Sequence, residues 1–207
     1  MHLIPVKTPA ILKYIFPKLV WNMPASDKVI YLTFDDGPTP QITDWILGLL
    51  NQYKAKASFF CVGKNVEEHP NIYQNIISEG HTIGNHTYDH LKGWKSKASD
   101  YVKSVEKAST LIDSKLFRPP YGQITPRQSN LLVKMGYRVV MWNILSRDWD
   151  QDLDEQKCAD NVINNTSEGD IIVFHDSIKA ESNMRYALPK VLDYFSERGY
   201  SFKRIPE

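Results

Sequence analysis

Two adjacent carboxylates and a pair of histidines are the residues of this sequence best suited to chemistry. Asp35 and Asp36 end the apolar run 29–34, and His86 and His90 lie about fifty residues further on, four positions apart. One carboxylate and two imidazoles make a three-ligand site for a divalent metal ion and leave a position for water. Because a structural zinc site is closed by four protein ligands, a site of this kind would be catalytic.

Asp36, His86 and His90 are the expected metal ligands, and one divalent ion is the expected cofactor. Zinc suits an oxygen and two imidazole nitrogens best, and cobalt, nickel, iron and manganese are the alternatives. The spacing of the histidines places both rings on one side of a helical turn. The alternative interpretations are hydrogen-bonded core histidines and a carboxylate pair that meets the positive end of the next helix. The combination of all three residues favours the metal site.

Asp35 is the expected base, since a bound water needs a proton acceptor and this carboxylate is next to a ligand. In an extended backbone the two neighbouring side chains would point to opposite faces. The turn at Gly37 and Pro38 is an alternative that would bring both carboxylates to one side. The sequence leaves this choice open.

A leaving group needs an acid, and His175 is the candidate because it ends an otherwise apolar strand. A histidine with a near-neutral pKa suits proton donation. Asp148, which precedes Trp149, could hold the imidazole and raise its basicity. The alternatives are a histidine at the edge of the core that bonds to Asp176, and a plain loop carboxylate at Asp148.

Arg118 and the loop that follows it complete the candidate site. Arg118 could pair with Asp35 and keep it ionised, or it could form a surface salt bridge. Residues 119–122, with two prolines before Tyr121, would form a rigid loop whose backbone N–H groups hold a developing oxyanion. Trp149, Tyr121 and Trp142 are aromatic candidates for contact with the substrate, and a core position is the alternative for Trp142.

Alternating strand and helix patterns must position these residues. The expected strands are 29–34, 57–62, 81–85, 117–118, 137–143, 170–174 and 200–205. The first expected helix starts at 39–40. The others span 70–80, 99–116, 125–136, 154–165 and 183–198. Such alternation predicts a parallel sheet covered by helices, in about seven β/α units. Because every candidate residue follows a strand, we expect a TIM-like, irregular (β/α)7 barrel, in which strand ends surround a single mouth.

The composition limits the classes of function. The chain has 207 residues, a formal net charge of +1 and no cluster of Lys and Arg, which argues against a nucleic-acid partner. Cys61 and Cys158 form no metal motif and are expected to be buried thiols. No secretion signal or transmembrane span is recognisable. We therefore expect a cytoplasmic monomer, and we treat three matches to the glycosylation pattern as chance.

The N-terminal segment carries apolar residues at helical spacing before the first strand. We expect a leader, 1–25, that docks through this stripe on the main domain, and contact with a membrane surface is the alternative. The stripe consists of Ile11, Leu12, Ile15, Phe16, Leu19 and Val20.

Five motifs in a fixed order make the sequence from about Val29 onward similar to the polysaccharide deacetylases, the NodB-homology group of carbohydrate esterase family four. They are Thr33-Phe34-Asp35-Asp36-Gly37, His86-Thr87-x-x-His90, Arg118-Pro119-Pro120-Tyr121, Asp148-Trp149 and Ile172-x-x-His175. Any one of them would be weak, whereas the ordered set is specific. The resemblance makes 26–207 the expected catalytic domain and a carbohydrate the expected partner.

The resemblance implies metal-dependent removal of acetyl groups from N-acetylated sugars of a peptidoglycan- or chitin-like poly- or oligosaccharide. It assigns the base to Asp35, the metal to Asp36, His86 and His90, and the acid to His175. It further implies that Arg118 orients Asp35, that Asp148 tunes His175 and that the Tyr121 N–H contacts the oxyanion. These implied roles agree with the candidates drawn from the residues alone.

The sequence departs from the family pattern at Leu145, where the fourth motif usually has an Asp. Ile172, where Leu is usual, is a smaller change. The Leu145 change removes a polar group near the mouth, so it concerns substrate preference more than the chemistry. The alternatives are an O-deacetylase of the acetylxylan type, a small-molecule amidohydrolase and, from another class, an inactive carbohydrate-binding relative.

Overall fold

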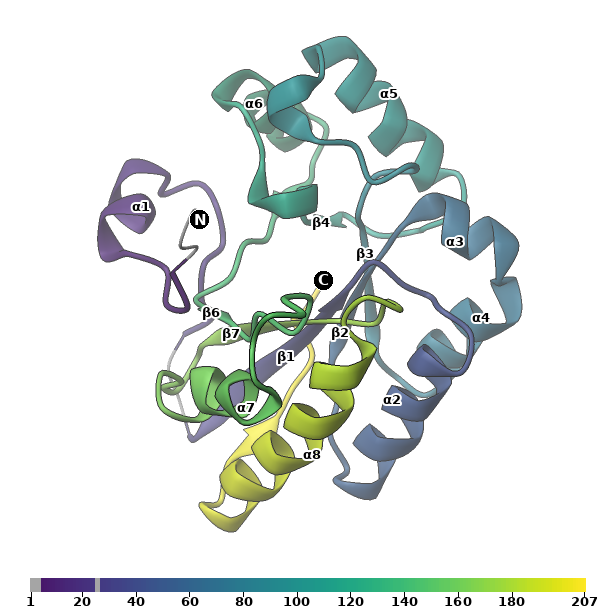
Figure 1. Ribbon diagram of the computed structural model, residues 1–207. Coiled ribbons are helices and arrows are strands. Elements are labelled where there is room, and N and C mark those ends of the chain that lie inside the picture. The colour runs from purple at the N-terminus through teal and green to yellow at the C-terminus, as the bar shows by residue number, and fades with distance from the viewer. Residues whose placement is uncertain (1–4, 25–26) are drawn as a thin grey trace.

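Strands and helices alternate along the chain in the computed structural model, which describes residues 5–24 and 27–207 (Figure 1). The strands in these residues are β1 (Val29–Asp35), β2 (Ser58–Cys61), β3 (Thr82–Asn85), β4 (Leu116–Phe117), β5 (Arg138–Val139), β6 (Ile144–Leu145), β7 (Ile171–His175) and β8 (Ser201–Phe202). The helices are α1 (Ala10–Ile15), α2 (Ile42–Gln52), α3 (Gly63–Glu68), α4 (Pro70–Ser78), α5 (Ala98–Ser109), α6 (Pro126–Lys134), α7 (Glu155–Ile163) and α8 (Glu181–Glu197), with short 3₁₀ turns at Gly93–Lys95 and Pro120–Gly122.

The strands form one curved parallel sheet that makes up an irregular barrel. Their order is β5-β4-β3-β2-β1-β7-β6, so β1 lies near the centre, between β2 and β7. β8 pairs with the start of β1 through Val29 and Ile30. The register of β1 and β7 sets Asp35 opposite His175. The barrel expected from the sequence is thus confirmed, with seven strands in the main path.

An N-terminal arm, residues 6–23, lies between β5 and β6, which do not pair with each other in the described residues. On one side Thr8 N–H donates to the Asn143 carbonyl at 2.8 Å. On the other side Met141 N–H donates to the Val20 carbonyl at 2.7 Å. The arm satisfies backbone groups that an open barrel would leave unpaired.

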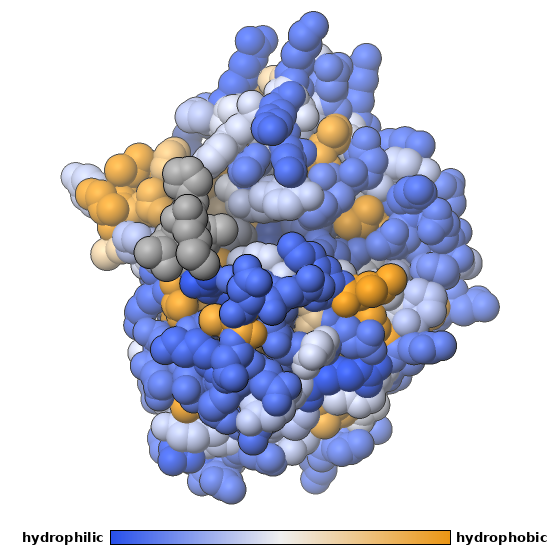
Figure 2. Space-filling view, in the orientation of Figure 1, coloured by the Kyte–Doolittle hydropathy of each residue, from blue (hydrophilic) through white to orange (hydrophobic). Residues whose placement is uncertain are grey.

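α1 projects from this arm, and its apolar residues do not dock as the sequence suggested. No residue of α1 is buried, although Leu19, beyond the helix, is. Figure 2 shows the apolar surface as an orange projection where Figure 1 has α1. The exposed residues of the expected stripe are Ile11, Leu12, Ile15 and Phe16.

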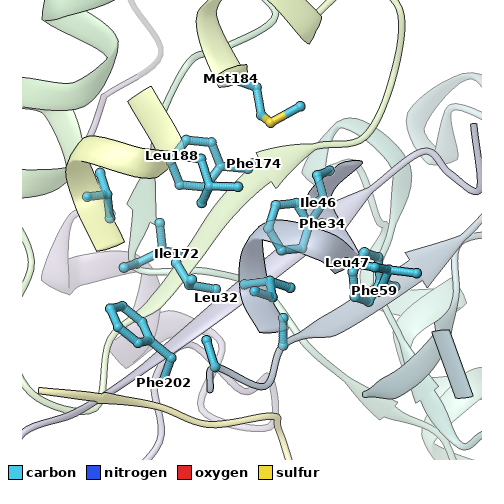
Figure 3. Close-up of a cluster of buried hydrophobic side chains, with 14 of the residues drawn as sticks. Leu32, Phe34, Ile46, Leu47, Phe59, Ile172, Phe174, Met184, Leu188 and Phe202 are labelled. Atoms are coloured by element: carbon cyan, nitrogen blue, oxygen red, sulfur yellow. The ribbon is translucent and has the colours of Figure 1, made fainter. Parts of the chain in front are cut away.

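The largest core lies between the outer face of the sheet and the helices, and Figure 3 shows its centre. Alternate residues of a strand face opposite sides, so Leu32 and Phe34 of β1 join this core, as does Phe174 of β7. Full burial of such a side chain stabilises the fold by about 1.5–3 kcal/mol. The intervening residues, which include Thr33 and Asp35, face the interior of the barrel. The core therefore fixes which side chains reach the site.

The strand expected at 137–143 is wrong in its extent, because only Arg138–Val139 of this range forms a strand, β5, and β6 follows separately at Ile144–Leu145. Val140 and Met141 lie between the two pieces, and their carbonyls accept hydrogen bonds from the Arg118 side chain. The Met141 N–H is bound by the arm. Since these groups have partners outside the sheet, the ladder stops after Val139 and resumes at Ile144, at the opposite edge.

The helix boundaries differ from the expected ones at three places. The second helix begins at Ile42 after Gln41, which has φ 65°, and not at 39–40. α3 was not expected, and α5 ends at Ser109 well before residue 116. By contrast, the start of α6 agrees with expectation, because Thr125 and Gln128 form a capping box. None of the helices in the described residues has the length and apolar character needed to cross a bilayer.

Candidate active site

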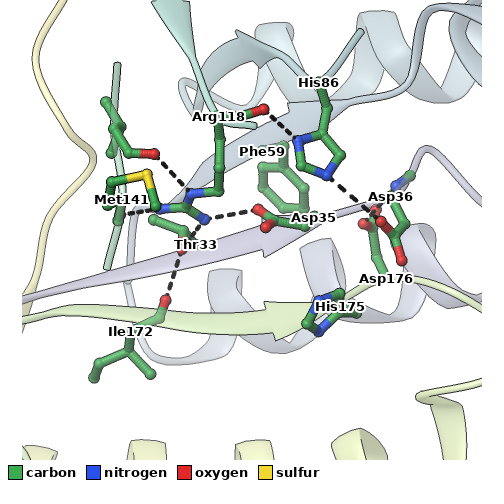
Figure 4. A network of polar contacts seen from close by, with 12 residues as sticks. Thr33, Asp35, Asp36, Phe59, His86, Arg118, Met141, Ile172, His175 and Asp176 are labelled. Atoms are coloured by element: carbon green, nitrogen blue, oxygen red, sulfur yellow. Dashed lines mark hydrogen bonds and ion pairs between the residues drawn. The ribbon is translucent and has the colours of Figure 1, made fainter. Parts of the chain in front are cut away.

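Most of the candidate residues line one cavity of about 850 Å³ at the carboxyl ends of the strands, and Arg118 and Asp148 are buried behind it. Asp35 and Asp36 reach it from β1, His86 and His90 from the segment after β3, and His175 from β7. Figure 4 shows the contact of Asp35 with Arg118 and the contacts of His86 with Asp36 and with the Arg118 carbonyl. The site residues that the sequence indicated at strand ends are therefore brought together.

Asp36, His86 and His90 can hold a metal ion, because one ligand atom of each lies within 4.8 Å of the others. The Oδ1 atom of Asp36 is 3.1 Å from Nε2 of His90 and 3.7 Å from Nε2 of His86. One carboxylate oxygen and two imidazole nitrogens are the donor set that zinc and similar ions prefer. The donor atoms present thus fit a divalent ion.

A hydrogen bond at Nδ1 of His86 leaves Nε2 free to bind a metal ion. Nδ1 lies 2.7 Å from the carbonyl oxygen of Arg118, so it carries the proton and Nε2 is left as an acceptor. His86 is 2% exposed, and burial lowers its pKa to about 4. A ring that is neutral at pH 7 can donate a lone pair to a cation.

Asp36 reaches the same side as Asp35 because its backbone leaves the extended conformation, with φ 86°. This positive φ costs free energy for a residue other than glycine. The Asn65 side chain donates to the Asp36 carbonyl at 2.7 Å and supports the conformation. Burial disfavours the charged form, but the hydrogen bond from His90 and the charges of His175 and His86 outweigh it and lower the pKa of Asp36. The turn alternative for the two carboxylates is the one that occurs.

Asp35 is held by Arg118 in the interior of the barrel. Nη1 of Arg118 donates to Oδ1 of Asp35 at 2.7 Å and to the Thr33 hydroxyl at 2.7 Å. Arg118 is fully buried, with its guanidinium 4.1 Å from the ring centre of Phe60. The surface salt bridge considered for Arg118 is therefore wrong, and the pair with Asp35 is present.

His175 is bound twice by Asp148. Its Nδ1 lies 2.8 Å from Oδ1 of Asp148, and its backbone N–H donates to Oδ2 at 2.6 Å. Burial lowers the pKa of His175, but the charge and the hydrogen bond of Asp148, with the nearby Asp36 and Asp35, raise it overall to about 10. The edge of the Trp149 ring packs on the imidazole, with ring centres 4.9 Å apart. His175 pairs with Asp148 and not with Asp176.

Tyr121 lies across the cavity from these residues, in the 3₁₀ turn after Arg118. Its ring centre is 4.6 Å from that of His90, and the Nζ atom of Lys92 is 4.6 Å from the Tyr121 ring. Tyr121 has φ 59° and Gly122 has φ 67°. A Cβ on Gly122 would lie 2.6 Å from the Trp142 ring, so glycine permits the close approach of loop and tryptophan.

One wall of the cavity is apolar, and it contains the position where the sequence departs from the family pattern. Leu145, Val173, Trp142 and Trp149 line it. Ile172 lies behind this wall in the outer core, because alternate residues of β7 face opposite sides. The side chain after Ile172, Val173, is thus the one that meets a bound molecule.

Asp176 is a structural residue of the site that the sequence analysis did not select. It is 1% exposed, and its carboxylate accepts hydrogen bonds from Gly37 N–H at 2.8 Å and from the Thr43 hydroxyl at 2.7 Å. Burial raises its pKa to about 8, although both hydrogen bonds oppose the shift. The only signal in the sequence was its position directly after His175, which suggested a bond to that histidine. Asp176 instead binds Gly37 and Thr43.

Replacing Gly37 by Ala is expected to lower the free energy of unfolding by about 1–3 kcal/mol, because an added Cβ would overlap the Asp176 carboxylate. Urea denaturation measures the change. Gly48→Ala is the matched control, since nothing lies within 4 Å of its added Cβ in α2. That control is expected to raise stability by about 0.5–1 kcal/mol. Equal effects at both positions would contradict the close packing at Gly37.

Comparisons with known proteins agree with this geometry. Residues 22–140 match the family model described as polysaccharide deacetylase. The chain is 35% identical over 206 residues to a peptidoglycan-N-acetylglucosamine deacetylase of Bacillus cereus, which covers 91% of this chain and 92% of that protein. It is 31% identical to a chitooligosaccharide deacetylase of Azorhizobium caulinodans, covering 86% of this chain and 92% of that one.

A solved structure is similar over nearly the whole chain. The crystal structure of the Bc1960 peptidoglycan N-acetylglucosamine deacetylase superposes with a TM-score of 0.88 at 30% identity. The match covers 96% of this chain and 95% of the other. It extends over the barrel and over most of the N-terminal residues.

Proposed function

The chain belongs to the polysaccharide deacetylase family, and we propose that it hydrolyses acetyl groups from the N-acetylated sugars of a peptidoglycan- or chitin-like glycan. It is a hydrolase of carbon–nitrogen bonds that deacetylates a polysaccharide. One observation carries the finer proposal. A three-ligand set, a separate buried carboxylate and a carboxylate-paired imidazole line the same cavity.

Asp35 is the proposed base. Its carboxylate forms a direct ion pair with the buried Arg118, which holds it in place. It lines the cavity close to Asp36, so a water molecule between substrate and ligand set is within its reach. Asp35 takes a proton from this water as the water oxygen adds to the acetyl carbonyl carbon.

His175 is the proposed acid. Asp148 favours the protonated imidazole, as the raised pKa of His175 indicates. Nδ1 is occupied by Asp148, which leaves Nε2 as the donor atom. His175 gives its proton to the sugar nitrogen as the carbon–nitrogen bond breaks, and the products are acetate and a free amino sugar.

The ligand set and Tyr121 are proposed to stabilise the carbonyl oxygen. The family is generally metal-dependent, and zinc is the ion we propose, with cobalt, nickel, iron and manganese as chemically similar alternatives. A divalent ion held by Asp36, His86 and His90 would act as a Lewis acid toward the acetyl carbonyl and lower the pKa of water in the site. The backbone N–H of Tyr121 is proposed to donate to the same carbonyl oxygen.

The apolar wall is proposed to contact the acetyl group and the sugar face. Leu145, Val173 and Trp142 offer carbon surface for the acetyl methyl. Trp149 and Tyr121 offer ring surface for a pyranose. No carboxylate projects from position 145, so this wall carries less charge than the usual family pattern would give it.

Acetate release from matched substrates tests the proposal. The purified protein, loaded with zinc, is incubated with chitin oligosaccharides, peptidoglycan fragments and acetylxylan. Release from the N-acetylated substrates supports it. Release from acetylxylan alone would identify an O-deacetylase, and release only from single acetamido sugars a small-molecule amidohydrolase. Binding without release from any of them would identify an inactive carbohydrate-binding relative.

Replacing Asp36 by Ala is expected to abolish metal binding and deacetylation together, because two imidazoles alone make a weak site. Zinc binding is measured by calorimetry and acetate release by an enzymatic assay. Treating the unmodified protein with a chelator should have the same effect on activity, and added zinc should reverse it. Asp89→Ala, an exposed carboxylate between His86 and His90, is the control that should retain zinc. Zinc bound by Asp36→Ala with undiminished affinity would contradict the assignment.

The oligomeric state and the location suggested by the sequence remain predictions. Light scattering of the purified protein tests the monomer. Cell fractionation tests the cytoplasmic location. A carbohydrate partner, by contrast, is the natural expectation for a member of this family.

A further inference from the structure

The α1 tip, defined as residues 9–18, presents the densest group of exposed apolar side chains in the described residues. The described residues contain eleven exposed large hydrophobic side chains, and five of these lie within residues 11–16. These five are therefore clustered. Their exposed fractions reach 59% for Ile11, 83% for Tyr14 and 55% for Ile15. Single exposed apolar residues are ordinary, but a contiguous group marks a contact surface.

The tip is held in place on both sides, so its exposure is a property of the folded chain. Before it, Thr8 donates to the Asn143 carbonyl through its N–H and to the Trp142 carbonyl through its hydroxyl. After it, Leu19 is buried, and the Trp21 indole N–H donates to the Phe16 carbonyl at 3.1 Å. The Val20 N–H also donates to the Val139 carbonyl at 2.9 Å. The base of the tip is thus fastened to the barrel on both sides, and its apolar side chains remain exposed.

All charged side chains of the N-terminal arm are positive. Residues 1–26 contain three lysines, Lys7, Lys13 and Lys18, and no Asp, Glu or Arg, whereas the whole chain has a net charge of only +1. The acidic residue that acts on Lys13 is Asp170, which is itself buried and accepts hydrogen bonds from Asn143 and Ser167. Lys7 lies before the tip, and its Nζ donates to the Asn165 carbonyl at 3.0 Å. The tip itself carries Lys13, which is half-buried, and Lys18, which is exposed, so its solvent side combines apolar side chains with positive charge.

This combination distinguishes a lipid surface from a protein partner. Lysine is depleted at protein–protein interfaces, where arginine is enriched, and this arm has lysine alone. The tip projects from the body of the molecule (Figure 2). Lysines beside Ile, Leu, Tyr and Phe side chains match the boundary between anionic headgroups and acyl chains, where short apolar segments bind in the membrane plane.

We propose that the α1 tip docks this protein on the surface of an anionic phospholipid bilayer. Ile11, Tyr14 and Ile15 enter the boundary between headgroups and acyl chains, and the exposed Lys18 contacts a lipid phosphate. This is peripheral contact by a surface segment. The proposal does not depend on the deacetylase activity, because none of these residues lines the catalytic cavity.

Sedimentation with lipid vesicles tests the proposal on the full chain. The unmodified protein is expected to pellet with vesicles of mixed phosphatidylglycerol and phosphatidylcholine, to stay in solution with phosphatidylcholine alone, and to be released as salt screens the charges. Ile11→Ser with Ile15→Ser removes two side chains one helical turn apart. It should lower the partition coefficient on the order of ten-fold or more. Lys18→Glu should lower it at least about five-fold, the effect of one charge near an anionic surface.

Ile77→Ser is the matched control, because Ile77 in α4 is 40% exposed and lies outside the arm. It should leave vesicle binding unchanged. Circular dichroism verifies that each variant is folded. Because vesicle binding is read without substrate, a failure of the deacetylase proposal leaves this test intact.

Two results would overturn the proposal. One is that anionic vesicles do not pellet the protein at low salt, or pellet the Ile11→Ser, Ile15→Ser variant equally well. The other is a dimer, seen by light scattering, that this double variant converts to a monomer. That result would identify a second copy of the chain as the occupant of the tip.

Discussion

Replacing Asp35 by Asn is expected to lower kcat by about 10²–10⁴-fold while the zinc affinity changes little. The amide keeps the shape of the side chain but cannot take the proton from water. The three proposed ligands are untouched, and the amide oxygen of the variant can still accept a hydrogen bond from Arg118. Steady-state acetate release and zinc calorimetry separate the two effects.

Asp44→Asn is the matched control for this change, since Asp44 is exposed in the first turn of α2. Its kcat should stay within about two-fold of the unmodified protein, as expected for a surface change away from the site. If Asp35→Asn retains near-normal turnover, the base assignment is wrong. If it loses zinc as well, Asp35 belongs to the ligand set.

A second large effect is expected on stability, where Arg118→Met should cost about 3–5 kcal/mol. The change leaves Asp35 as a buried carboxylate without its ion-pair partner. It also removes the donors to the Val140 and Met141 carbonyls, which lie where the sheet is interrupted. Chemical denaturation measures the free energy of unfolding.

The double variant Asp35→Asn with Arg118→Met should be more stable than Arg118→Met alone, because no unpaired charge remains. Arg127→Met is the control, since Arg127 is exposed at the start of α6 and should change stability by no more than about 0.5 kcal/mol. A cost below about 1 kcal/mol for Arg118→Met would mean that water relaxes into the site and solvates Asp35.

The barrel could be predicted from the sequence because its strongest signals are local. The strand β1 and the cap of α6 depend on residues that are neighbours in the sequence. The apolar run that starts at Val29 predicts the strand, and Thr125 with Pro126 predicts the start of the helix. The position of the candidate side chains after successive strands then favoured a single mouth. The order of the motifs added the family.

The parts that failed depend on contacts distant in sequence. Residues 140–143 have the composition of a strand, but their backbone groups bind Arg118 and the arm. An apolar stripe such as that of α1 predicts burial against another part of the chain. The pattern cannot show that no other part of the described chain covers α1. The Asp176 contact with Gly37 joins residues 139 positions apart, and no spacing rule reaches that far.

The candidate site was predictable in its membership and not in its geometry. Residue types identified Asp35, Asp36 and His175. The direction of the two neighbouring carboxylates depends on the positive φ of Asp36, which a sequence pattern does not encode. The role of Asp148 beside His175, rather than Asp176, is equally a matter of orientation.

The arm between β5 and β6 imposes an order on folding. It leaves the ribosome before any strand of the barrel, yet Thr8 bonds to Trp142, 134 positions later. Closing so long a loop is entropically costly and slow. The arm is therefore expected to pack on the barrel last, after β6 and β7 have formed. Until then its lysines help to keep the unpacked arm in solution. Trp21 of the arm is buried in the folded chain, so its fluorescence after rapid mixing would follow the closing of the barrel.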